Sequence, residues 1–225
     1  MIINLDTAAL ARQLGKPEGK EPSVQDLIYA LKHSNPNVRV QAIDALAMVR
    51  EDQSLVDAVE PLVETLKDKD ESVSFAAACA LGEISKYISS LVLVLIKALK
   101  DNDVFIRRGA AWALKENMRA SNAVRALSEA LEDDDMTVRE NAAYAIEMIG
   151  MGESEAVIPA LVKVLKERKQ ISDRLCLHAI QALGKCGKDT IETRNILTKI
   201  KEDDQNPTMR LSASCSLMHI GPEPH

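Results

Sequence analysis

Residues 135–150 read Asp-Met-Thr-Val-Arg-Glu-Asn-Ala-Ala-Tyr-Ala-Ile-Glu-Met-Ile-Gly, and the chain contains five other versions of this stretch at intervals of 32 to 37 residues. Each version has one central hydrophobic residue, the anchor; the six anchors are Leu46, Leu81, Leu114, Ile146, Leu183 and Leu217. An alanine stands four residues before every anchor, and an apolar residue stands eight residues before it. This spacing predicts a helix in each copy, with one apolar face.

The beginning and the end of these helices can also be read from the sequence. A side chain that can accept a hydrogen bond from a free backbone N–H stands eleven residues before each anchor; these residues are Asn35, Asp70, Asp103, Asp135, Ser172 and Asn206. Such residues are typical helix N-caps. Pro36 and Pro207 follow two of them, at the first helical position, where proline is well tolerated. Each copy therefore predicts a second helix, preceded by a first helix and a short turn.

A period of 32 to 37 residues favours one continuous stack, in which each unit buries its apolar face on the next. We expect an N-terminal capping helix and linker over residues 1–22 and a single domain of six repeats over residues 23–225. The predicted repeats cover residues 23–52, 53–86, 87–119, 120–152, 153–188 and 189–225.

Composition excludes several classes of protein. The net charge of −6 and the pI near 5.4 disfavour nucleic-acid binding, which needs a basic surface. The sequence has no run of 18 apolar residues and no signal-peptide pattern at its start, so we expect a cytoplasmic protein without a membrane partner. The aromatic content of 3% means that the core is built from Ala, Leu, Ile and Val.

The repeated pattern resembles a known family. Asp-x-x-Val-Arg-x-x-Ala-Ala-x-Ala-Ile-x-x-Ile-Gly at 135–150, with Val38-Arg39, Ile106-Arg107 and Met209-Arg210 in other copies, is similar to the HEAT-like repeat first associated with phycobilin (PBS) lyase subunits. The resemblance covers residues 23–221. It implies an all-α fold, a right-handed α-α superhelix (solenoid) of about six HEAT-like helical hairpin repeats, with the second helices on its concave side. Proteins built of such repeats include scaffolds, bilin lyase subunits and a metal-dependent hydroxylase.

The hydroxylase activity is not expected here. That enzyme carries His-Glu pairs directly after the arginine of several repeats, and these supply its iron ligands. The pairs at the matching positions of this chain, for example Val40-Gln41 and Glu140-Asn141, include no His-Glu. His33, His178, His219 and His225 lack metal-ligand spacing and are interpreted as surface residues. We therefore predict no catalytic residue, no metal and no cofactor.

Four arginines stand seven residues before their anchors: Arg39, Arg107, Arg139 and Arg210. An Asp or Asn lies in the turn just before each of them, so we expect a structural ladder of arginine-to-acid bonds that aligns successive turns. Ser74 and Cys176 replace the arginine in copies two and five, where the ladder is expected to be interrupted.

The positions six and two before the anchor lie one turn apart and away from the alanine face. They bring aromatic residues to consecutive copies, and the resemblance implies that they line the concave groove. The candidate binding strip consists of Phe75, Arg108, Trp112, Glu140, Tyr144, Leu177 and Gln181, with Lys115 at its edge. The alternative is that these aromatics fill space between neighbouring helices. Exposed aromatics beside arginine are typical of interaction hot spots.

The leading functional hypothesis is a non-enzymatic scaffold that holds a protein or peptide partner in the concave groove. The alternative is a bilin lyase-like or bilin-handling subunit, in which the same aromatics would stack on a tetrapyrrole and Arg108 would pair with a propionate. A nucleic-acid-binding array is a third possibility, disfavoured by the charge. No polar capping helix follows the last repeat, so Leu211, Leu217 and Ile220 are also candidates for self-association.

Overall fold

The helices begin where the capping residues predict. The computed structural model describes residues 7–50, 53–117, 120–150, 154–168, 170–186 and 190–221. In all six copies the predicted cap accepts a hydrogen bond from a backbone N–H two or three residues ahead, at 2.8 to 3.1 Å. The six caps are confirmed. Ser23 and Asp26 also form the reciprocal capping box that starts the first paired helix.

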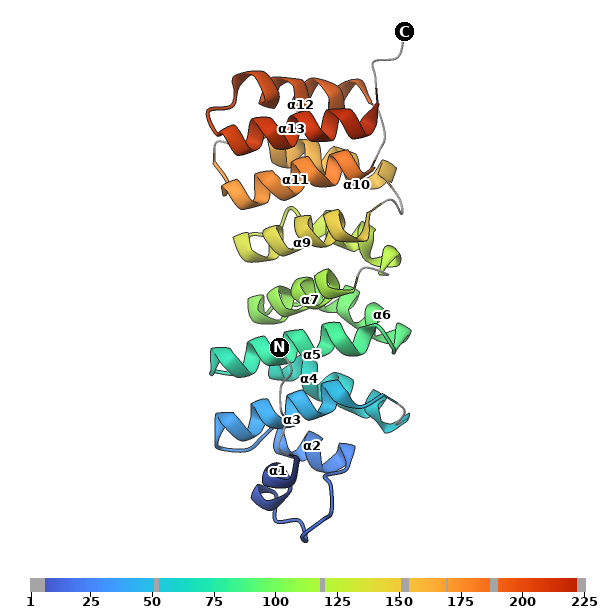
Figure 1. The fold of residues 1–225 in the computed structure, drawn as a ribbon, viewed down its shortest axis with the longest axis vertical. Coiled ribbons are helices and arrows are strands. Elements are labelled where there is room, and N and C mark those ends of the chain that lie inside the picture. The colour runs from blue at the N-terminus through green and yellow to red at the C-terminus, as the bar shows by residue number, and fades with distance from the viewer. Residues whose placement is uncertain are drawn as a thin grey trace. The chain divides into compact units, whose positions relative to one another are not determined.

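Contacts within the chain divide it into two compact units, Met1–Glu116 and Asn117–His225. In the first unit, a short helix precedes three helical hairpins (Figure 1). Its elements are α1 (Thr7–Gln13), α2 (Val24–Ala30), α3 (Pro36–Met48), η1 (Gln53–Ala58), α4 (Val59–Thr65), α5 (Glu71–Ser85), α6 (Ser89–Ala98) and α7 (Val104–Glu116). The second helices α3, α5 and α7 pack on one another in sequence order.

The second unit also consists of three hairpins. Its elements are η2 (Ser121–Ala123), α8 (Val124–Ala130), α9 (Met136–Ile149), α10 (Ser154–Lys166), α11 (Asp173–Cys186), α12 (Ile191–Asp203) and α13 (Pro207–Ile220). The second helices α9, α11 and α13 again pack in order. The described residues contain helices and no strand, so the predicted all-α fold of about six helical hairpin repeats is confirmed. The predicted single domain and its repeat boundaries stay predictions.

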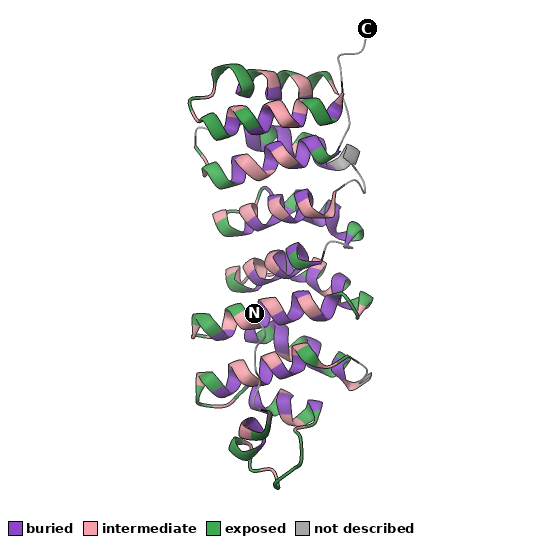
Figure 2. Ribbon diagram, in the orientation of Figure 1, coloured by how far each residue is buried: buried purple, intermediate pink, exposed green. Residues whose placement is uncertain are grey.

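The core follows the repeated pattern. The alanine four residues before each anchor is fully buried in every copy, and five of the six anchors are at most 1% exposed. The sixth anchor, Leu217, is half-buried. Figure 2 shows the buried residues along the sides of the helices that face their neighbours. Since alanine has a single methyl group, this face lets the next helix approach closely.

Glycine extends the close approach at the position just after the anchor. A Cβ atom built on Gly184 of α11 would lie 2.6 Å from Ser216 Oγ and 2.9 Å from Ser216 Cα of α13. Gly82 of α5 meets α7 in the same way, with its Cβ position 2.8 Å from Glu116 Cβ. These glycines are therefore required by packing, since both lie in the interior of regular helices.

Within the described part of the chain, each helix is too short or too polar to cross a lipid bilayer.

We expect Gly184→Ala to destabilise the protein by about 1 to 3 kcal/mol, because the added methyl group overpacks the α11–α13 contact. Helix propensity alone would give the opposite sign, a gain of about 1 kcal/mol. Urea unfolding followed by circular dichroism measures the difference. Gly184→Ala combined with Ser216→Gly should recover part of the loss, because it removes the clashing Oγ and Cβ atoms. A more stable Gly184→Ala variant would contradict the close approach.

Candidate binding surface

Two predicted strip residues of the first unit form an aromatic pair. The rings of Phe75 on α5 and Trp112 on α7 meet edge to face, with centroids 5.0 Å apart and an interplanar angle of 64°. Phe75 is 52% exposed, whereas Trp112 is half-buried. Both rings stand on second helices at the positions that the sequence predicts. The pair therefore both packs two repeats together and presents apolar surface to solvent.

The cation of Lys115 is not free at the edge of this surface. Its Nζ lies 3.0 Å from the centroid of the Trp112 ring and 3.8 Å from a carboxylate oxygen of Glu116. Lys115 is only 8% exposed. Its aliphatic chain and ammonium thus cover one face of the indole, which is a cation–π contact. Lys115 supports Trp112 and contributes little accessible charge.

The indole nitrogen of Trp112 points away from solvent. Among the described residues, Nε1 is buried without a hydrogen-bond partner of good geometry. The thiol of Cys79 on α5 lies on this side of the ring. Burial raises the pKa of Cys79, and the nearby indole N–H partly offsets that effect. Trp112 consequently offers a partner ring surface and no polar atom.

Arg108 lies one turn before Trp112 on α7. Its guanidinium carbon is 5.6 Å from the ring centroid of Phe105, which is itself 52% exposed. Sequence reasoning did not select Phe105 because it lies outside the two strip positions. Phe75, Phe105, Arg108 and Trp112 together form the apolar and cationic part of this face, which we call the aromatic patch.

A carboxylate stands on the same face of the first unit. Asp44 of α3 occupies the position that Cys79 has in α5 and Trp112 has in α7. It is half-buried, and burial raises the pKa of its carboxyl group. No hydrogen bond or ion pair reaches this carboxylate from the described residues. Asp44 stands at a strip position in the sequence, but it is not among the predicted binding residues.

The strip residues of the second unit are held by polar contacts. Tyr144 of α9 packs edge to face on His178 of α11, with ring centroids 4.7 Å apart. His178 Nδ1 lies 2.8 Å from Glu147, and Lys185 Nζ lies 2.8 Å from the other oxygen of the same carboxylate. His178 is therefore not a plain surface histidine, because it connects α9 to α11.

Glu147 is 8% exposed, so its two partners decide its charge state. Burial alone would raise the pKa of its carboxyl group, but the hydrogen bonds and positive charge from His178 and Lys185 outweigh burial and hold this pKa below its ordinary value of 4.5. The carboxylate is thus ionised at neutral pH.

The remaining strip residues of this unit are half-buried. Glu140 accepts a hydrogen bond of 2.6 Å from Ser172 Oγ and lies 3.8 Å from Arg174. Leu177 and Gln181 lie one turn apart on α11. Both strip acids of the second unit, Glu140 and Glu147, therefore already have partners within the chain.

Arg39 makes the kind of contact expected of the arginine ladder. Its Nη2 lies 2.7 Å from Asp68 in the turn of the next repeat, and both side chains are largely buried. Its Nη1 donates to the backbone carbonyls of His33 and Ser34 in its own turn. One guanidinium therefore closes one turn and attaches the following turn to it.

The other ladder arginines differ in whether they contact only their own turn or also the turn of the next repeat. Arg139 donates to the Leu131 carbonyl and lies 3.6 Å from Glu167 of the next turn. Nη1 of Arg107 and of Arg210 donates to two carbonyls of its own turn. At the two positions without arginine, Ser74 Oγ and Cys176 Sγ also contact the carbonyl eight residues back.

The predicted interruption of the ladder at the fifth repeat was wrong. Cys176 does not reach the next turn, but Arg168 does, with Nε 3.3 Å from Asp204. The turn of this repeat is about three residues longer than in the first four copies, and the added segment supplies Arg168. An alignment based on the arginine position alone could not detect this substitute.

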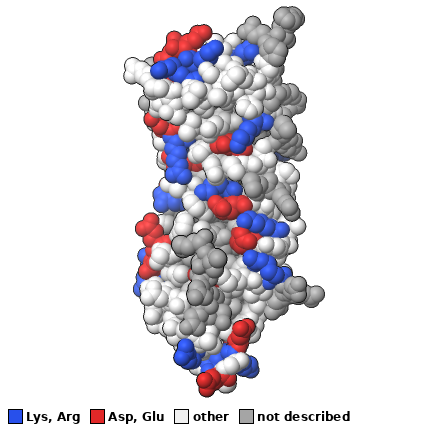
Figure 3. Space-filling view, in the orientation of Figure 1, with Lys and Arg blue, Asp and Glu red and all other residues white. Residues whose placement is uncertain are grey.

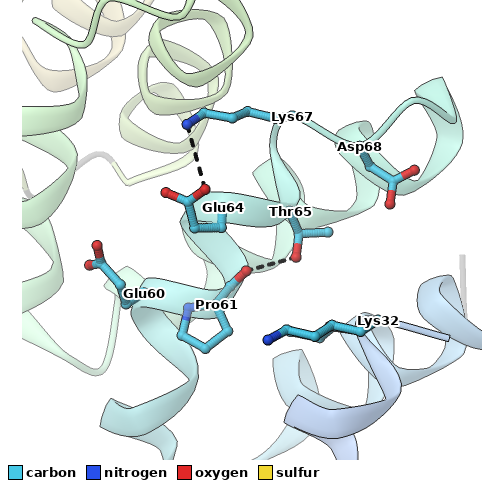
Figure 4. Close-up of a pocket in the computed structure, with 8 residues that line it drawn as sticks. Lys32, Glu60, Pro61, Glu64, Thr65, Lys67 and Asp68 are labelled. Carbon is cyan, nitrogen blue, oxygen red and sulfur yellow. Dashed lines mark hydrogen bonds and ion pairs between the residues drawn. The ribbon is translucent and has the colours of Figure 1, made fainter.

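The first helices carry mixed charge. A depression of about 390 Å³ between α2 and α4 is lined by residues that include Lys32, Glu60, Glu64 and Lys67. Figure 4 shows Glu60, Glu64 and Lys32 around Pro61, with Lys67 paired to Glu64 at 3.5 Å. Mixed charge is not confined to the first helices, because Figure 3 also shows positive and negative side chains close to one another on the face in view. This arrangement is typical of a solvated surface.

The described residues contain no group of three or more His, Cys, Asp or Glu side chains that could hold a metal ion. Burial raises the pKa of Cys79, Cys176 and Cys186, to about 11 for Cys176, so these thiols are weak nucleophiles.

The C-terminal residues proposed for self-association differ in exposure. Leu211 of α13 is 67% exposed, Leu217 is half-buried and Ile220 is 7% exposed. Met218, which was not selected from the sequence, is 73% exposed in the last turn of the helix. Self-association through α13 stays a prediction.

Comparison with known proteins supports the helical repeat architecture. A family model described as HEAT repeats matches residues 24–115 and 92–175, without naming the phycobilin lyase subtype. A comparison with curated proteins gives no match.

Similar solved structures include an engineered protein, with a TM-score of 0.61 and 23% identity over 88% of this chain and 96% of that one. A designed armadillo repeat protein in complex with the peptide (KR)4 has a TM-score of 0.58 and 21% identity, over 89% of this chain and 100% of that one. YibA of Escherichia coli has a TM-score of 0.58 and 23% identity, over 94% of this chain and 74% of that one. At these identities the likeness shows the fold.

We expect Arg39→Met to reduce the free energy of unfolding by about 3 kcal/mol, because it leaves the largely buried Asp68 carboxylate with only the Asp70 N–H as a partner. Arg210→Met is the matched control, since Arg210 holds its own turn and should cost less. Adding Asp68→Asn to Arg39→Met should recover part of the loss in chemical denaturation. Equal losses for the two single variants would show that the contact between turns adds nothing.

Glu147→Gln should lower stability at pH 7 by about 1 to 2 kcal/mol, because it weakens two charge-assisted hydrogen bonds. The folded-state pKa of Glu147 lies below 4.5, so its contribution is complete above that pH and is lost as pH falls through the folded pKa. The wild type and the variant should therefore converge in acid. Thermal melts from pH 7 to pH 3 test this, with Glu202→Gln at an exposed position of α12 as a control. A difference that does not change with pH would refute the assignment.

Proposed function

The chain belongs to the HEAT repeat family, and on that premise we propose that it is a non-enzymatic interaction scaffold whose second helices bind a segment of a partner protein. The observation that carries this proposal is the exposed aromatic patch of the first unit. Large apolar side chains that remain in solvent beside an arginine are enriched at protein interfaces. The patch is built on regular helices, so its residues are held in place before a partner arrives.

Each residue of the aromatic patch would contribute differently to binding. Phe75 provides accessible ring surface, Trp112 provides a ring face braced by Lys115, and Arg108 provides positive charge next to Phe105. The partner segment would lie across α5 and α7, because the two rings belong to these neighbouring helices. The designed armadillo repeat protein that resembles this chain is described in complex with a peptide, which supports a peptide-like partner. Tyr144, Leu177 and Gln181 would serve the second unit in the same way.

The bilin-handling alternative has less support. In it Arg108 would pair with a propionate while the aromatic rings stack on the tetrapyrrole, but Lys115 already covers one face of the Trp112 ring. No specific observation favours a tetrapyrrole over a polypeptide.

Panning of a phage-displayed library of random dodecapeptides tests the proposal. Peptides enriched on the wild type should lose about tenfold or more in affinity for Phe75→Ala, because hot-spot side chains contribute about 2 kcal/mol or more. Leu93→Ala on α6 is the matched control, since Leu93 is a similarly exposed apolar residue on a first helix. It should change affinity by about twofold or less, in keeping with a surface substitution away from the site.

Phe75 is half-exposed, so the variant should stay folded, and circular dichroism checks this. Enriched peptides that bind Phe75→Ala and the wild type equally, or no enrichment at all, would reject the aromatic patch as a binding site.

A further inference from the structure

The first unit carries an acidic group that its own structure does not use. Asp44 is half-buried on α3, and the described residues give its carboxylate neither a hydrogen bond nor an ion pair. One turn earlier on the same helix, Gln41 Oε1 is buried without a donor. Burying an unpaired carboxylate costs free energy, so such groups are normally paired. Two neighbouring acceptors on one helix therefore lack donors.

The charged groups nearest to this position do not neutralise it. Cys79 occupies the same repeat position on α5, and the charges of Asp44, Lys115 and Glu116 all act on the pKa of its thiol. Lys115 is held on the Trp112 ring and near Glu116. Glu83, further along α5, is paired with Arg50 and Lys86. Asp44 is thus a carboxylate on this part of the face to which the described residues supply no ion pair.

We propose that the second-helix face of the first unit binds a segment whose lysine or arginine pairs with Asp44 while an apolar side chain of the same segment lies on Phe75 and Trp112. The proposal rests on the scaffold function above and specifies the chemistry of the partner. A cationic side chain supplies several N–H donors, which is what a carboxylate beside an amide oxygen lacks. The net charge of −6 also favours a cationic partner.

The repeat geometry sets the spacing within the partner. Packed helices lie about 8 to 10 Å apart, so Phe75 on α5 is about one helix spacing from Asp44 on α3. A chain in the polyproline II conformation advances about 3.1 Å per residue and has three residues per turn, so side chains three residues apart lie on the same side of it. The cationic residue and the apolar residue of the partner should therefore be about three residues apart. A partner segment in this orientation crosses the second helices. Contact with both rings of the aromatic pair on α5 and α7 requires the same orientation.

The probe is a synthetic peptide, Gly-Ser-Gly-Ser-Arg-Gly-Ser-Leu-Gly-Ser-Gly-Ser, with blocked ends. A second peptide carries Glu in place of Arg, and a third carries neutral citrulline there. Binding is followed by the fluorescence of Trp112, the single tryptophan of the chain, and by isothermal titration calorimetry. The Arg peptide should bind most tightly and the Glu peptide most weakly.

Asp44→Asn should weaken the Arg peptide about tenfold, as expected for loss of a charge-assisted hydrogen bond, and should make the Arg and citrulline peptides bind alike. Glu60→Gln on α4 makes the same charge change away from this face and should leave binding unchanged. Asp44→Asn should also melt at the same or a higher temperature, because it removes a charge that burial disfavours. A residue with a merely structural role would lose stability instead.

The outcomes separate this inference from the proposed function. If peptides recovered by panning require Phe75 but bind Asp44→Asn and the wild type equally, the scaffold function holds and the role of Asp44 is wrong. If the Glu peptide binds at least as well as the Arg peptide, Arg108 rather than Asp44 selects the partner. If neither the probe peptides nor the panned peptides bind, both proposals fail.

Discussion

The distance between successive second helices is the constraint on which the rest of the structure depends. It is set by the fully buried alanine four residues before each anchor and by glycine at Gly82 and Gly184. With so little side-chain volume between the helices, the next turn comes within reach of Arg39 and Arg168. The same closeness brings Phe75 and Trp112 into ring contact across two repeats. Packing, turn alignment and binding surface are thus three results of one spacing.

The fold could be predicted from the sequence because its signals are local and repeated. Each second helix is marked by one cap and by an alanine four residues before the anchor. This pair of signals occurs in all six copies, so each copy supports the assignment of the others. The first helices were harder to predict in detail, since η1 and η2 add one or two turns of 3₁₀ helix that follow no repeated pattern. The longer turn of the fifth repeat shows the same limit, because Arg168 has no counterpart at that position in the other copies.

The candidate site could be predicted only in part. Position within the repeat placed Phe75, Trp112 and Tyr144 on second helices, but it could not say how far their neighbours cover them. Lys115 illustrates the reason: a long side chain at the edge of a surface can fold back onto an aromatic ring. Asp44 illustrates the converse, since the lack of a partner is a property of the whole neighbourhood and not of one residue. Sequence periodicity predicts the face of the helix on which a side chain lies, whereas the solvent accessibility of that side chain depends on contacts between repeats.

The replacement of an arginine in the helix by Arg168 in the turn has a consequence for how such chains can be altered. The ladder at the fifth repeat keeps its bond to Asp204 although the segment before α11 is longer. Turns between paired helices can therefore accept inserted residues as long as one inserted side chain restores the link to the following turn. Residues 167–171 mark a natural position for grafting a foreign loop, in which Arg168 would be the residue to retain and Ser172 would remain as the cap of α11.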